Sequence, residues 1–66
     1  MLNTMFFQFL SLGNIDKIQT IDKTTVIYNF SDINMKVVFT TPVTIKSEIP
    51  NLLMDNQLEI KKLTFY

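Results

Sequence analysis

The sequence has 66 residues, a formal net charge of zero and 47% hydrophobic residues. It contains no cysteine and no histidine, which excludes disulfide bonds and thiolate zinc sites and removes the commonest nitrogen ligand for metals. A chain of this length forms one small domain, residues 1–66, that buries only about 60% of its unfolded surface. Oligomerisation or a partner protein therefore remains as a source of further stability.

Residues 1–12 are very hydrophobic and are compatible with two structures. Thr4 as an N-cap and Gly13 just beyond the segment are typical of a short helix. Three phenylalanines, the absence of alanine and a Gly13-Asn14 turn are typical of a strand, which is the structure we favour. Such a strand is apolar on both faces, so we expect the segment to be either core or an oligomer interface.

The next segment, residues 15–21, carries isoleucine at every third position: Ile15, Ile18 and Ile21. This spacing fits neither a regular strand nor a regular helix. A strand with a bulge near Lys17-Ile18 accounts for it, because a bulge shifts the alternation by one residue.

Residues 24–41 predict two strands joined by a tight turn. Almost every residue from 24 to 30 is β-branched or aromatic, as in half-buried strands. Alternation predicts a core of Val26, Tyr28, Phe30, Val37 and Phe39. The opposite face carries one apolar residue from each strand, Ile27 and Val38, and so needs partial cover as well. Residues 31–34 suit a type I turn with Asn34 in the left-handed conformation.

The remaining segments predict further short strands. Residues 43–46 have a strand pattern, residues 47–51 a loop, and residues 52–56 one helical turn or a short strand. Residues 57–66 predict a last strand with a bulge at the Lys61-Lys62 pair, where the apolar alternation changes parity. The fold expected is all-β: an antiparallel meander of five or six strands, barrel-like or an open roll, with a short N-terminal helix as the alternative for its first segment.

The residue types required for common catalytic sites are missing or scattered. Three serines occur without a histidine to activate them, and the Lys46-Ser47 neighbours point to opposite faces of a strand. A single glycine cannot build a phosphate-binding loop, and the acidic residues are dispersed. We expect no enzyme activity, no cofactor and no metal.

A single-stranded nucleic-acid-binding barrel is one alternative, with Tyr28, Phe30 and Phe39 as a stacking platform. Zero net charge and the absence of arginine count against it, so nucleic acid is not the expected partner unless the six lysines cluster on one face.

Protein binding is the function we favour, as an inhibitor or adaptor on a larger target. A structural subunit of a homo-oligomer, a dimer or higher, is the alternative. The expected interface residues are Phe6, Phe7, Phe9, Leu10, Ile27 and Val38. The composition is typical of AT-rich coding sequences such as those of phages and plasmids. The absence of a signal-peptide pattern and of a long apolar run predicts a cytoplasmic protein without a membrane span.

Overall fold

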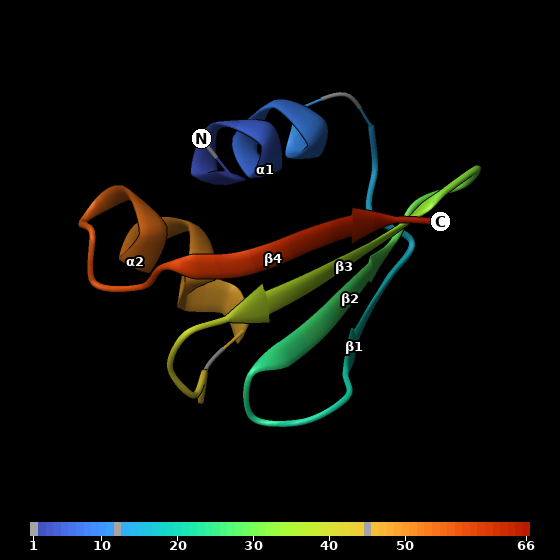
Figure 1. Ribbon diagram of the computed structural model, residues 1–66. Helices are drawn as coiled ribbons and strands as arrows, with labels where there is room; N and C mark the ends of the chain where they lie inside the picture. Colours follow the sequence, from blue (N-terminus) through green and yellow to red (C-terminus); the bar gives the residue numbers. More distant parts are fainter. Residues whose placement is uncertain (1, 12, 45) are drawn as a thin grey trace.

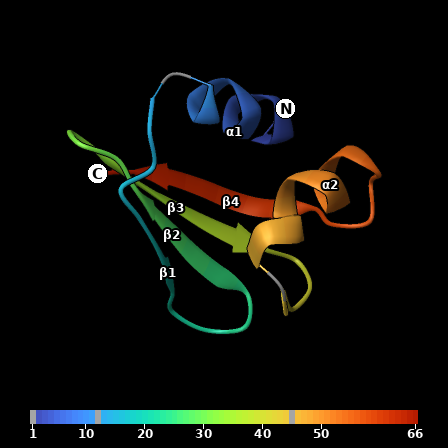
Figure 2. The same cartoon turned by 180° about the vertical axis from the view of Figure 1, so that it is seen from behind.

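The computed structural model describes residues 2–11, 13–44 and 46–66. The elements, in chain order, are helix α1 (Leu2–Leu10), strands β1 (Lys17–Thr20), β2 (Thr25–Asn29) and β3 (Asn34–Phe39), the 3-10 turn η1 (Lys46–Glu48), helix α2 (Ile49–Met54) and strand β4 (Ile60–Phe65). The strands form an antiparallel sheet in the order β1-β2-β3-β4. Helix α1 lies along β4, and α2 lies near the end of the sheet where β4 begins (Figures 1 and 2).

The predicted antiparallel meander is confirmed, but an all-β fold of five or six strands is wrong. Over the described residues there are four strands and two helices, and β1 and β4 each pair on one side only, so the sheet is open. The strand predicted for residues 43–46 is not formed. The Val43 amide donates to the Lys23 carbonyl at 2.7 Å, and Lys46 begins η1, while Ile45 lies outside the described residues.

Helix α1 replaces the strand that the sequence favoured for this segment, and the helical alternative is correct. A strand in this segment would be apolar on both faces, and a small domain could bury only one of them. Helical spacing directs Leu2, Phe6 and Phe9 toward the core and leaves Thr4 and Gln8 exposed on the other side. The segment is therefore amphipathic only in the helical conformation.

The central hairpin forms as predicted, with Val26 opposite Val37 and Tyr28 opposite Met35. Its loop is shorter than expected, because the Phe30 amide donates to the Ile33 carbonyl at 2.9 Å and only two residues lie between them. The left-handed conformation predicted for Asn34 is wrong. Asn34 is the first residue of β3, and the described part of the chain has positive φ only at Asn56.

One face of the sheet and both helices enclose the hydrophobic core. Its buried residues are Phe6, Val26, Tyr28, Met35, Val37, Phe39, Ile49, Leu53, Leu58 and Ile60. The core predicted for the hairpin is confirmed except at Phe30, which is half-buried and packs against the edge of the core. The Phe6 and Tyr28 rings meet edge to face at 5.4 Å, which attaches α1 to β2.

Strand β1 pairs with β2 in one unbroken register, so the bulge predicted near Lys17-Ile18 is wrong. Ile15 and Ile21 lie outside the strand and are exposed. The spacing of three therefore marks the ends of a short strand and not an interruption within it.

Strand β4 contains the second predicted bulge, which is confirmed. The pairing steps from Lys62 opposite Val38 to Ile60 opposite Phe39, leaving Lys61 as the extra residue. Because this residue shifts the alternation by one, apolar side chains on both sides of the lysine pair face the core.

Helix α2 includes Pro50, so the loop predicted for residues 47–51 is wrong. Proline is tolerated in the first turn of a helix, where the missing N–H would have no intrahelical partner. After the helix, Asn56 takes φ 58° and the Gln57 amide donates to the Leu52 carbonyl at 2.9 Å. This Schellman-type ending turns the chain toward β4.

Candidate functional site

The helices cover one face of the sheet only, and on the other face Thr25 is nevertheless buried, with 6% exposure. Both helices contribute to the core that contains Tyr28, so both lie on that face, and neither lies over the other (Figures 1 and 2). Strand alternation gives the uncovered side, here called the open face: Lys17, Gln19, Thr25, Ile27, Asn29, Asn34, Lys36, Val38, Lys62 and Thr64. The open face thus draws residues from all four strands.

The register arranges the open face in three rows across the strands. These are Lys17–Asn29–Asn34, then Gln19–Ile27–Lys36–Thr64, then Thr25–Val38–Lys62. Ile27 and Val38 are diagonal neighbours in the middle of the face, and both are half-buried. The exposed Lys36 lies beside Ile27. The centre of the face is therefore apolar with lysine around it.

Positive charge is concentrated on the open face although the net charge of the chain is zero. The four strands contain no Asp or Glu, whereas Lys17, Lys36 and Lys62 lie in the three rows and Lys61 forms the bulge at the edge. The acidic residues lie in η1 and in the connections between elements: Asp16, Asp22, Asp32, Glu48, Asp55 and Glu59. The strands thus carry lysines without carboxylates, whereas the connections carry both, as at Asp22-Lys23 and in η1.

One acidic residue of the connections acts locally in a turn. The Asp22 Oδ1 atom accepts hydrogen bonds from the Thr24 amide at 2.8 Å and from the Thr24 hydroxyl at 3.0 Å. These donors hold the pKa of Asp22 below its ordinary value. The carboxylate therefore stabilises the β1–β2 turn in its charged form.

The open face also holds a polar pair with one unpaired atom. Asn29 donates from Nδ2 to the Gln19 Oε1 atom at 2.9 Å, which links β2 to β1 through side chains. The Asn29 Oδ1 atom is buried and has no hydrogen-bond donor within the described structure.

A second surface lies where α1 meets the C-terminal end of β4 and the β2–β3 loop. A hollow of about 350 Å³ there, called the apolar groove below, is lined by Met5, Gln8, Phe9, Ile33 and Phe65. The ring centroids of two of these residues, Phe9 and Phe65, are 4.7 Å apart. Helix α1 has no charged residue, so this groove is uncharged as well as apolar.

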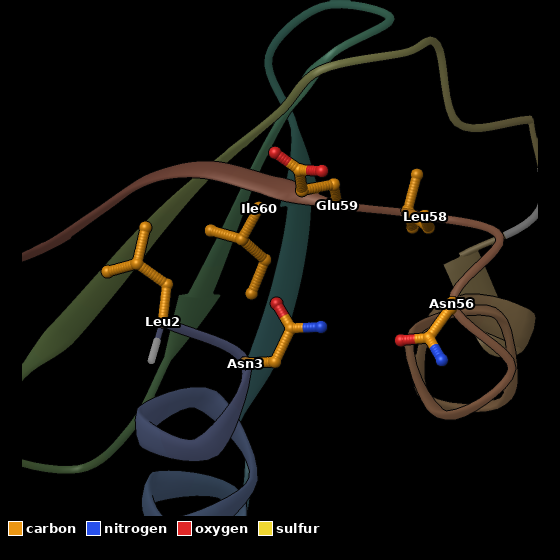
Figure 3. Close-up of a pocket in the computed structure, with 6 residues that line it drawn as sticks. All are labelled: Leu2, Asn3, Asn56, Leu58, Glu59 and Ile60. Carbon is orange, nitrogen blue, oxygen red and sulfur yellow. The ribbon is translucent and has the colours of Figure 1, made fainter.

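A second hollow, of about 440 Å³, lies between the start of α1 and the segment that enters β4 (Figure 3). It is lined by Leu2, Asn3, Asn56, Leu58, Glu59 and Ile60. In Figure 3 the Glu59 side chain extends away from Asn3, while Ile60 points toward α1. The hollow therefore does not bring a nucleophile and a base together. No group of three His, Cys, Asp or Glu side chains suitable for a metal occurs in the described ranges.

The structure divides the predicted interface residues among three places. Phe6 is in the core with 0% exposure and is not available to a partner in this fold. Phe7, Phe9 and Leu10 are half-buried on α1, and Ile27 and Val38 are half-buried on the open face. The lysines around Ile27 and Val38 were not selected from the sequence, although strand alternation already placed Lys36 on the same side as Val38.

The aromatic platform considered for nucleic-acid binding does not lie on the surface. Tyr28 is 3% exposed and Phe39 is 1% exposed, because both belong to the core. Stacking on bases by these two rings is therefore blocked in the folded chain.

Among the helices that the structure describes, none combines the length and the apolar content required to cross a membrane. The chain matches no family model, no curated protein and no solved structure. The interpretation of function below therefore depends on the surfaces of this fold.

Proposed function

We propose that this chain is a non-enzymatic protein-binding module that attaches to a larger partner through its open face, as an inhibitor or an adaptor does. The observation that supports the proposal is the one-sided sheet. Two helices cover one face, and the other presents Ile27 and Val38 at the centre of a polar surround. An apolar centre with a polar rim is the usual arrangement in protein interfaces.

The charge of the open face favours a different protein over a second copy of this chain. A symmetric dimer brings the same patch of each subunit together, so two patches that each carry Lys17, Lys36 and Lys62 would share one interface. Like charges placed opposite each other in an interface oppose association.

Site-specific photocrosslinking tests the proposal. A photoreactive amino acid is placed at Ile27 on the open face or, as the matched control, at Met54 on α2, which is 70% exposed. In cells that produce the chain naturally, we expect one discrete protein adduct from position 27 and none from position 54. An identical pattern from both positions, or no adduct from position 27, would contradict binding through the open face.

A homo-oligomeric subunit is the second candidate, and the apolar groove favours it. Since α1 is uncharged, two copies can bring their grooves together without repulsion between like charges. This surface lies on the helix side of the sheet, so self-association through the groove leaves the open face free.

A further inference from the structure

Building on the proposed function, we infer that the partner presents an acidic amphipathic helix to the open face. Its carboxylates pair with Lys17, Lys36 and Lys62, and its apolar side chains pack on Ile27 and Val38.

The charge of the open face supports an acidic partner. Three lysines occupy the rows of the face, and no carboxylate lies among them. Glu59 borders the face, since its carbonyl accepts the Thr40 amide at 3.0 Å one residue before β4. Asp22 borders the face as well, because its carboxylate is within hydrogen-bonding reach of the Thr25 side chain, and Asp16 directly precedes Lys17. Within the three rows the charged residues are all lysines, and the carboxylates lie at the margin of the face. Carboxylates from a partner would reduce the repulsion among the lysines and steer association.

The positions of the lysines set the length of the partner segment. Neighbouring strands are about 4.8 Å apart and each strand residue advances about 3.4 Å, so Lys36 and Lys62 are about 8 Å apart at Cα. Lys17 and Lys62 lie on the two outer strands, about 20 Å apart by the same geometry. A helix of about 13 residues spans that distance. The molecule measures 29 × 23 × 19 Å, so one such helix extends across most of the face.

The apolar centre favours a polypeptide over a nucleic acid. Ile27 and Val38 offer packing surface to apolar side chains, which a phosphate backbone lacks. The three rows contain no arginine, so bidentate phosphate contacts are not available on this surface. Tyr66 pairs with Asn34 through two backbone hydrogen bonds, so alternation adds one exposed ring to the end of the first row, and base stacking would depend on this ring alone.

Titration of the isotope-labelled chain with three probes tests the inference. The probes are an amphipathic peptide of about 15 residues built from Glu and Leu, the same peptide with Lys in place of Glu, and an oligothymidylate. We expect the acidic peptide to shift the amide signals of Ile27, Lys36 and Val38, and to bind more weakly as salt is added. The basic peptide and the oligothymidylate should produce no comparable shifts.

A pair of charge-matched variants locates the contact. Lys36→Glu, on the open face, should weaken binding of the acidic peptide by at least about tenfold, which is the effect of losing one close charge pair. Lys46→Glu, in the exposed turn η1, should change the affinity less than about twofold. Thermal melting of both variants confirms that the fold is retained, because both side chains are exposed.

Several outcomes overturn the inference. These are no binding of the acidic peptide, equal binding of the basic peptide, tighter binding of the oligothymidylate, or signal shifts confined to the apolar groove. The photocrosslinking experiment shows whether only the inference of an acidic helix is wrong or the proposed protein binding is wrong as well. If position 27 forms an adduct with a partner that has no acidic helix, the proposal of protein binding stands and the inference of an acidic helix is wrong.

Discussion

Phe39 illustrates how much of the stability depends on single aromatic residues. It is 1% exposed and lies in the core formed by the sheet and both helices. Phe39→Ala leaves a cavity and should lower the free energy of unfolding by about 3–5 kcal/mol, which approaches the whole stability of a small domain. Met54→Ala is the control, because Met54 is 70% exposed and its truncation should cost less than about 0.5 kcal/mol. Thermal unfolding followed by circular dichroism measures both. A Phe39→Ala variant that melts within a degree or two of the parent contradicts the core assignment.

Because of Tyr28, we expect the free energy of unfolding to decrease at alkaline pH. Burial raises the pKa of Tyr28 to about 12, because the phenolate loses its hydration in the core. In the unfolded chain the phenol titrates near 10. The folded state therefore keeps its proton to higher pH, and the stabilisation is complete below about pH 10 and is lost as the pH rises toward 12. The loss can reach about 3 kcal/mol, from about 1.4 kcal/mol per pKa unit.

Tyr28→Phe provides the comparison for this prediction. The variant keeps the ring but has no ionisable group, so its unfolding free energy should fall less than that of the parent between pH 10 and 12. Denaturant unfolding at several pH values measures the difference. Parallel curves for parent and variant are the result that contradicts a buried, neutral Tyr28.

At the scale of elements, the β4 bulge protects a free sheet edge. Strand β4 is an edge strand. Lys61 is an extra residue that interrupts its regular pairing with β3, and Lys61 and Lys62 together place two positive charges on the strand. Edge strands with bulges and lysines are poor templates for pairing with other chains. The bulge therefore limits strand-to-strand aggregation at this edge.

Deletion of Lys61 tests the role of this bulge. Without the extra residue, Ile60 and Lys62 fall into regular alternation opposite β3, so the core contacts are retained. We expect the free energy of unfolding to change by less than about 1 kcal/mol, while light scattering on prolonged incubation increases because the edge is flatter. Deletion of Leu63 is the control, since it moves the later residues of β4 to the wrong face and should unfold the chain. A Lys61 deletion that unfolds, or that scatters no more than the parent, argues against edge protection.

The hairpin and the β4 bulge could be predicted because their signals are local. Alternation along residues 24–41 defines both faces, and the parity change at the lysine pair marks the bulge. Helix α1 could not be predicted in this way, because its phenylalanines also suit a strand. The helix is selected by packing against a sheet whose strands are distant in sequence. Helix α2 could not be predicted because Pro50 is typical of a loop as well as of the first turn of a helix.

The candidate site was only partly predictable for a related reason. The sequence identifies Ile27 and Val38 as apolar residues opposite the core, but it does not show which face the helices cover. Only with α1 and α2 placed on the Tyr28 side do the lysines of β1, β3 and β4 become one charged surface. The lysines of the open face are non-local, because strands far apart in sequence provide them.

At the scale of the whole molecule, two surfaces of different character lie on opposite sides of the sheet. We expect the chain to form at least a dimer at micromolar concentration through the apolar groove. Met5 is 46% exposed in that groove, so Met5→Asp should dissociate the dimer while the monomer stays folded. Ile27→Asp, on the open face, should leave the dimer intact. Sedimentation equilibrium measures both variants, and a parent that is monomeric at 100-fold above micromolar concentration contradicts the prediction.

The packing of α1 along β4 has a consequence during synthesis. The ribosome completes α1 about fifty residues before β4, which at about 5–20 residues per second is a delay of several seconds. Until then Phe9 cannot reach Phe65, which lies 4.7 Å from it in the folded chain, and the half-formed sheet cannot cover the phenylalanines of the first helix. The core therefore cannot be completed before the last strand leaves the ribosome, and until then the aromatic residues of the first helix lack their partner on that strand.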